Sequence, residues 1–232
     1  MNSNWSTQTK VGEFVEDNIL CAQTFEDLSI DFCCGGETSL ENACLDTGLE
    51  PEDVLNRLRG LENPKTGQEG DLNSVTPGQL TLQIESEHHE YLKKALPRIA
   101  ELLTKVLSAH GDRFPELIVL EVKFAELREE LEPHLLKEER VLFPLIRKLE
   151  SEELGHNMKA VSGPIRVMLK EHDQAGDLLK NIREITAGFK VPEEGCQSFR
   201  LLYEELKFLE KDTHLHIHKE NNILFEKIKP VN

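Results

Sequence analysis

The sequence predicts an all-α protein in which an antiparallel four-helix bundle follows a small helical N-terminal domain. Two observations support this fold class. Long segments in the later part of the chain place apolar residues at alternating steps of three and four, which is the rhythm of one helix face. Breakers separate these segments around Gly111 to Pro115, Ser162 to Pro164 and Gly188 to Pro192.

Each of the four predicted bundle helices carries an apolar stripe. Amphipathic helices joined by short loops bury their stripes best when they pack side by side in antiparallel order. The stripe residues are Leu92, Leu96, Ile99, Leu103 and Val106; Leu120, Phe124, Leu127 and Leu131; Ile165, Met168, Ala175, Leu179 and Ile182; and Leu202, Leu206, Leu209 and Ile223.

The region between the two predicted domains lacks apolar periodicity. Residues 62–79 concentrate Pro, Gly, Asn, Ser and Thr, and we therefore place a linker at residues 62–76. The N-terminal domain then covers residues 1–61, where Val54, Leu55, Leu58 and Leu61 indicate a short helix. The bundle domain covers residues 77–232.

Charge and cysteine content exclude several classes of protein. The formal net charge is −16, with 43 acidic and 27 basic residues, so unaided binding to nucleic acid or to an anionic membrane is unfavourable. No signal peptide is recognisable, and no stretch approaches the roughly 20 apolar residues of a spanning helix. The five cysteines include one close pair, adjacent residues that cannot bridge each other without strain. We expect reduced thiols and a cytoplasmic protein.

Six potential metal ligands continue the apolar stripes. Histidine and ionised glutamate are costly to bury unless they are paired or bound to a metal ion. Six of them facing one core therefore predict a metal centre. The residues are His89, His134, Glu138, His172, His216 and Glu220.

The spacing of these residues indicates an internal duplication. A single histidine precedes each His-x-x-x-Glu pair by a similar distance, since 134 − 89 = 45 and 216 − 172 = 44. The flanks repeat as well: residues 137–143 read Lys-Glu-Glu-Arg-Val-Leu-Phe, and residues 219–225 read Lys-Glu-Asn-Asn-Ile-Leu-Phe. Two equivalent halves predict two equivalent metal ions.

The ligand types indicate which metal is bound. Residues four apart share a helix face, so each pair can give a nitrogen to one ion and a carboxylate that bridges to the next. Two imidazoles per metal and two bridging carboxylates suit iron better than zinc or calcium, with manganese as an alternative. The motif also differs from the Glu-x-x-His of ferritin-like bundles.

The remaining histidines fit the pattern less well. His88 adjoins His89 but fits the repeat less well. The offset between the halves is 216 − 134 = 82 for the second histidines, against 172 − 89 = 83 with His89 and 172 − 88 = 84 with His88. We therefore choose His89 as the ligand. His110, His156, His214 and His218 are expected to be solvated.

Four other residues have two interpretations each. Glu130 and Glu171 lie near ligands in the sequence and could orient them or relay protons, or they could be solvated acids. Cys33 and Cys34 precede two glycines, so they could contact a metal, a cluster or a disulfide partner. The alternative for the cysteines is a pair of small buried apolar residues at a turn.

The motifs together resemble one family over the whole chain. The segments that carry the resemblance are Asp31-Phe32-Cys33-Cys34-Gly35-Gly36, His134 to Pro144, Glu171 to Gly176, and His216 to Phe225. They are similar to the repair-of-iron-centres family, the ScdA/YtfE type of hemerythrin-like di-iron proteins. The resemblance implies a cytoplasmic stress-response protein with two iron ions per chain in an oxo- and carboxylate-bridged site.

The resemblance also implies a function and partners. It implies repair of iron-sulfur clusters damaged by nitrosative or oxidative stress, with iron delivery to damaged iron-sulfur proteins and a homodimeric state. It further implies that Glu130 and Glu171 line a polar route and that Cys33 and Cys34 take part in cluster or redox chemistry. Gly176 stands where oxygen-carrying hemerythrins have another histidine, so an open coordination position is expected. The alternatives are a nitric oxide or oxygen binding or sensing protein and a nitric oxide reductase; we favour repair over a turnover enzyme.

Overall fold

The computed structural model describes residues 5–61, 75–151 and 159–229. These residues form helices joined by loops, with an isolated antiparallel bridge between Lys10 and Ser39. The all-α prediction is confirmed. None of the described helices is long and apolar enough to cross a membrane.

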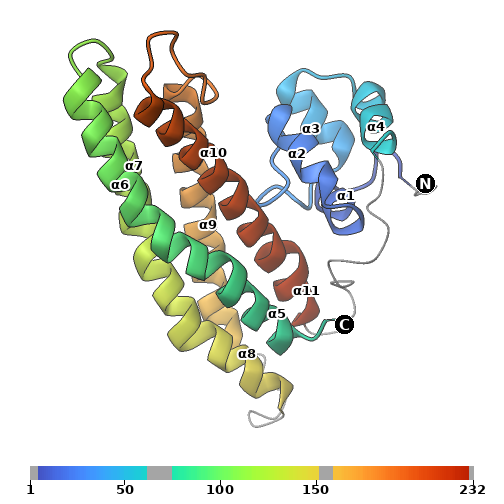
Figure 1. Ribbon diagram of the computed structural model, residues 1–232. Coiled ribbons are helices and arrows are strands. Elements are labelled where there is room, and N and C mark those ends of the chain that lie inside the picture. The colour runs from blue at the N-terminus through green and yellow to red at the C-terminus, as the bar shows by residue number, and fades with distance from the viewer. Residues whose placement is uncertain (1–4, 62–74, 152–158, 230–232) are drawn as a thin grey trace. The chain divides into compact units, whose positions relative to one another are not determined.

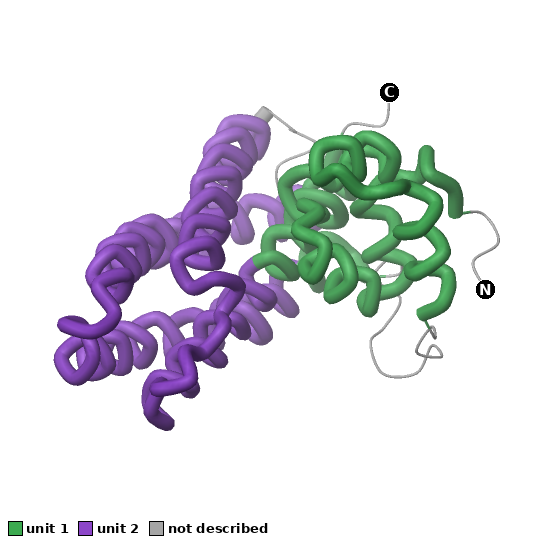
Figure 2. Tube along the Cα trace, turned by 90° about the horizontal axis from the view of Figure 1, so that it is seen from above, with its two compact units in different colours: residues 1–80, 214–232 green, residues 81–213 purple. Residues whose placement is uncertain are grey.

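The chain divides into two compact units (Figure 2). One unit comprises residues 1–80 and 214–232, and the other comprises residues 81–213. The division falls within a single helix, Gln197–His218. The predicted domain limits stay a prediction, and residues 62–74 of the predicted linker lie outside the described residues.

The long helices of residues 81–213 are α6 (Glu90–His110), α7 (Glu116–Lys137), α9 (Lys159–Ile185) and the part of α10 (Gln197–His218) up to residue 213. They run side by side (Figure 1), and α7 packs against both α6 and α9. The short loops after α6 and α9 contain the predicted breakers at 111–115 and 188–192. The helices from residue 77 to the C-terminus are α5 (Pro77–Ile84), η1 (Glu85–His89), α6 (Glu90–His110), α7 (Glu116–Lys137), η2 (Glu138–Leu142), α8 (Phe143–Glu150), α9 (Lys159–Ile185), α10 (Gln197–His218), η3 (Lys219–Leu224) and α11 (Phe225–Lys227).

The predicted apolar stripes form the core. All of the stripe residues are buried except Ile165, which is half-buried near the start of α9. The predicted break at Ser162 to Pro164 is wrong, because α9 continues through Pro164. Val161 and Met168, one on each side of that proline, are both buried, so packing of the apolar face outweighs the local cost of the missing N–H.

The N-terminal part of the other unit has an aromatic core. Its helices are α1 (Val11–Asp17), α2 (Leu20–Asp27), α3 (Leu40–Thr47) and α4 (Pro51–Arg59). Phe25 lies between Phe14 and Phe32, with ring centroids 5.9 and 6.3 Å apart. The Ser39 hydroxyl caps α3 by accepting from the Asn42 N–H. Gly48 ends α3 in the left-handed conformation, with φ of 70°.

Candidate metal centre

Three short π-helical stretches lie at the predicted ligands. The stretch η1 ends at His89, η2 begins at Glu138, and η3 contains Glu220. A π-helical turn inserts an extra residue into the α-helical rhythm, and such insertions concentrate at functional sites. Each stretch therefore changes the direction in which the following side chains point, at the predicted ligands.

Within residues 81–213, Glu138 lies among three imidazoles. Its carboxylate oxygens are 3.3 Å from His89 Nε2, 3.2 Å from His134 Nε2 and 3.9 Å from His172 Nε2. The Nε2 atoms of His134 and His172 are themselves 3.2 Å apart. All four side chains are almost completely buried, with Glu138 and His89 at 0% exposure.

The second His-x-x-x-Glu pair is equally buried. His216 and Glu220 have 1% and 0% exposure, and His216 Nε2 lies 3.2 Å from a Glu220 oxygen. One helical turn separates the two residues, so their side chains leave the same face of the chain. This geometry repeats that of His134 and Glu138 at the same distance.

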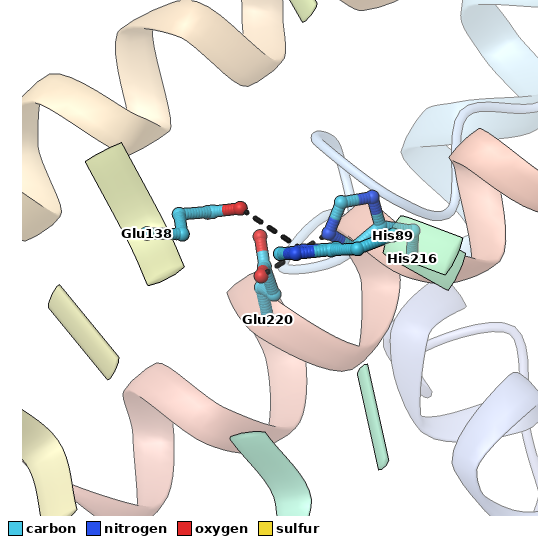
Figure 3. A group of neighbouring side chains, drawn as sticks. All are labelled: His89, Glu138, His216 and Glu220. Carbon is cyan, nitrogen blue, oxygen red and sulfur yellow. Dashed lines mark hydrogen bonds and ion pairs between the residues drawn. The ribbon is translucent and has the colours of Figure 1, made fainter. Parts of the chain in front are cut away.

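The six residues form two groups able to hold a metal ion. One group is His89, Glu138, His216 and Glu220 (Figure 3), and the other is His134, Glu138, His172 and Glu220. Within each group the ligand atoms lie within 4.8 Å of one another. Glu138 and Glu220 belong to both groups, as expected of carboxylates that bridge two ions. The donor set fits the predicted metal, because imidazole nitrogens and carboxylate oxygens both bind iron.

Glu138 and the neighbouring imidazoles shift each other's pKa values. Burial opposes ionisation of Glu138, but the adjacent imidazoles outweigh it and hold the carboxyl pKa well below its usual range. Burial likewise disfavours protonated His134, yet the Glu138 carboxylate raises the pKa of the imidazole to about 9. In the metal-free protein this pair holds a proton that a metal ion would have to displace.

Carboxylates outside the centre hold two of the imidazoles. His89 Nδ1 lies 2.9 Å from Glu139, which also pairs with Lys93 at 2.6 Å. His134 Nδ1 lies 2.9 Å from Glu171, which also pairs with Lys137. The hydrogen bond from His134, above all, lowers the pKa of Glu171 to about 2. Such partners orient Nε2 toward a metal.

Glu130 and Glu171, the two acids predicted to orient ligands or relay protons, lie in different environments. Glu171 contacts a ligand, whereas Glu130 is exposed. Sequence reasoning missed Glu139, although its position directly after Glu138, within the repeated segment, was a usable signal. The roles of Glu130 and Glu171 stay predictions.

Several histidines differ from expectation. The prediction that His218 is solvated is wrong: its exposure is 1%, and burial lowers its pKa to about 4. His214 is half-buried, 3.7 Å from Glu26, and His110 is half-buried, with Nε2 3.1 Å from Cys196 Sγ. His88 is also buried, with Nδ1 3.0 Å from Asp212. His156 lies outside the described residues.

The Cys33-Cys34 segment forms a tight loop around Asp31. The Asp31 carboxylate accepts from the backbone N–H groups of Cys33, Cys34 and Gly35, each at 2.9 Å. Cys33 is buried and Cys34 half-buried, with their sulfur atoms 3.8 Å apart. The contact with Cys34, together with burial, holds the pKa of the Cys33 thiol well above its usual value. Cys34 is therefore the accessible thiol of the pair.

Comparisons with known proteins agree with this geometry. Residues 81–228 match the hemerythrin HHE cation binding domain, and residues 7–62 match ScdA_N, a domain of unknown function (DUF542). The iron-sulfur cluster repair protein ScdA of Staphylococcus haemolyticus is 32% identical over 96% of this chain and 98% of its own length.

Two further relatives come from other genera. A probable iron-sulfur cluster repair protein of Haemophilus influenzae is 33% identical over 95% of this chain and 96% of its own length. The iron-sulfur cluster repair protein YtfE of Dickeya chrysanthemi is 33% identical over 87% of each chain. The resemblance predicted from the motifs is confirmed, and the chain belongs to the ScdA/YtfE family of hemerythrin-like proteins.

Proposed function

We propose that this protein holds two iron ions and repairs iron-sulfur clusters damaged by nitrosative or oxidative stress by delivering iron to them. The observation that carries the proposal is the pair of buried ligand groups that share Glu138 and Glu220. Relatives named as cluster repair proteins over nearly their whole length support the same function.

The ligand assignment follows from the two groups. His89 and His216 would bind one ion, His134 and His172 the other, and Glu138 and Glu220 would bridge them. Each ion would receive two imidazoles and two carboxylate oxygens, which leaves positions for exchangeable ligands on an octahedral iron. Manganese is the alternative metal. The bound pair would supply the labile iron that a damaged cluster has lost.

The surrounding residues have supporting roles in this proposal. Glu139 and Glu171 accept from Nδ1–H of His89 and His134 and so keep each Nε2 directed at the centre. Glu130, exposed one turn before His134, would form the outer part of a polar route that includes Glu171. Cys34, with Cys33 behind it, would offer the thiol that contacts a cluster or exchanges electrons.

The proposed partners are damaged iron-sulfur proteins in the cytoplasm. All five cysteines are free thiols, which agrees with a reducing compartment. The net charge of −16 disfavours nucleic acid and anionic membranes as partners. The family suggests a homodimer.

Iron quantitation followed by transfer tests the function. Anaerobically loaded protein should contain about two iron ions per chain, because six protein ligands with two shared carboxylates satisfy two ions. Mixed with a cluster-free ferredoxin, sulfide and a thiol reductant, it should restore the cluster while losing iron. Replacing both Cys33 and Cys34 with Ser should leave the iron content intact and reduce the repair.

The alternatives predict different results. Reversible binding of nitric oxide or oxygen without iron loss, and without cluster restoration, would favour a carrier or sensor. Turnover of nitric oxide with an electron donor would favour a reductase. One zinc ion and no iron in the anaerobic preparation would overturn the di-iron assignment.

A further inference from the structure

The loop of Cys33 and Cys34 is bound to the same chain segment that carries His216 and Glu220. The side-chain amide of Asn222 donates to the Phe32 and Cys33 carbonyls at 3.3 and 3.1 Å. The Asn221 amide donates to the Cys33 carbonyl at 3.2 Å. These amides thus satisfy buried carbonyl groups at the point where the two thiols begin.

The cysteine loop also packs closely against the segment that carries His216 and Glu220. The Phe32 ring lies 6.0 Å from the His214 ring and 5.7 Å from the His218 ring, between centroids. A Cβ atom added to Gly36 would fall 2.2 Å from Asn222 Oδ1, so a larger residue at this position would displace the Asn222 amide. The second glycine after the cysteines therefore allows the loop to approach Asn222.

The two asparagines share a π-helical stretch with a proposed metal ligand. Residues Lys219–Leu224 form η3, in which Glu220 directly precedes Asn221. Glu220 is fully buried and belongs to both ligand groups. A metal ion that fixes Glu220 would therefore restrict the backbone that carries both amides.

We propose that Asn221 and Asn222 are positioning residues that link the two-thiol loop to the metal-binding segment, so that metal loading changes the reactivity of Cys34. The link deepens the proposed repair function and rests on it for the presence of iron. When the centre is loaded, η3 is held and the amides keep the loop closed. When the centre is emptied, η3 loosens and Cys34 becomes more accessible, which couples iron release to thiol exposure.

The alkylation rate of Cys34 tests the link without any repair assay. Cys196 is exposed, so the experiment uses full-length protein with Cys196→Ser, in which Cys34 is the most accessible thiol; Cys21, Cys33 and Cys44 are buried. Iodoacetamide should modify Cys34 about tenfold more slowly in iron-loaded than in metal-free protein. A tenfold ratio corresponds to about 1.4 kcal/mol, which is the size expected when one or two hydrogen bonds to the loop are lost in the metal-free protein. Mass spectrometry of peptides identifies the modified residue, and iron is quantified in each sample.

Variants separate the link from general stability. In Asn222→Ala the Cys34 alkylation rates of loaded and metal-free protein should differ by about twofold or less, because the hydrogen bonds of Asn222 to the loop are lost. Arg140 is the residue that aligns with Asn222 in the first half of the repeat, and it is exposed. Arg140→Ala should therefore keep the tenfold difference in Cys34 alkylation rate. Gly36→Ala should also reduce the difference in Cys34 alkylation rate, because the new methyl group clashes with Asn222. In the Gly36→Ala, Asn222→Ala double variant this clash is absent, so Gly36→Ala should reduce the rate difference less than it does alone.

The outcomes are distinguishable. Equal Cys34 rates in loaded and metal-free wild-type protein would overturn the link even if iron is present and repair occurs. A full tenfold difference that survives Asn222→Ala and Asn221→Ala would also overturn it. Protein without iron would instead contradict the proposed function. Circular dichroism confirms that each variant compared is folded.

Discussion

The two halves of the internal repeat carry the same proposed ligands in different surroundings. An offset of 82 residues, since 216 − 134 = 82, aligns His134 with His216 and Glu138 with Glu220. The same offset aligns Leu136, which is 41% exposed, with His218, which is 1% exposed. The inward faces of the two segments therefore match, while their outward faces differ.

The outward faces differ because they make different contacts. In the first half, Glu139 holds the Nδ1 atom of His89 and Arg140 is exposed. In the second half, Asn221 and Asn222 bind the carbonyls of the cysteine loop. A binding site constrains the residues that face it, whereas the opposite side of each helix is free to serve another contact.

Substitution of the shared carboxylates tests whether the inward faces are equivalent. Glu138→Gln and Glu220→Gln should each reduce iron from about two ions per chain to below one, because an amide cannot replace a bridging carboxylate. Iron quantitation after anaerobic loading is the measurement. Normal iron content in either variant would remove that residue from the ligand set and break the equivalence of the halves.

The adjacent histidines test which residue begins the repeat. His89→Ala should lose iron, whereas His88→Ala should keep it and lose about 1–3 kcal/mol of unfolding free energy, because the partly buried Asp212 is left without its partner. Iron content and urea unfolding of the two variants give the comparison. The reverse pattern would show that His88 is the ligand.

The outer carboxylates test how far the equivalence extends beyond the ligands. Glu171→Gln and Glu139→Gln should weaken iron binding about 10–100-fold, as expected when a carboxylate no longer orients the imidazole. Competition with a chelator measures this affinity. Glu130→Gln is the matched control on an exposed residue and should leave iron affinity unchanged; an equal loss there would point to a general charge effect.

The pH dependence of stability tests the difference between His218 and Leu136. His218 has a folded pKa of about 4, below the unfolded value near 6.5, so the unfolded chain binds the proton more readily. The neutral, buried His218 ring contributes fully to the free energy of unfolding above pH 6.5, and this contribution is lost as pH falls toward 4.

His218→Leu, which copies the first half, provides the matched control. The unfolding free energy of the wild type minus that of the variant should fall by about 2 kcal/mol between pH 7 and pH 5. Urea unfolding at matched metal content measures both proteins. A difference that does not change with pH would show that His218 is not buried as a neutral ring.

Much of the fold and the inward face of the centre was predictable from the sequence. Apolar periodicity identified the core of each long helix, and extension of that periodicity brought six polar residues onto buried faces. The cost of burying charge then indicated a metal. The exception at Pro164 arose because a proline is a local signal, whereas the contacts that keep α9 continuous come from neighbouring helices.

What the sequence by itself determined is therefore the set of residues that must be buried together, because helix periodicity and charge burial are regular along the chain. Only the tertiary structure decided which polar groups meet across long sequence separations. Glu139 reaches His89, and Asn222 reaches the carbonyl of Cys33 through contacts 50 and 189 residues apart. Side-chain hydrogen bonds of this kind depend on distance and direction in space, and no periodic pattern along the chain specifies either.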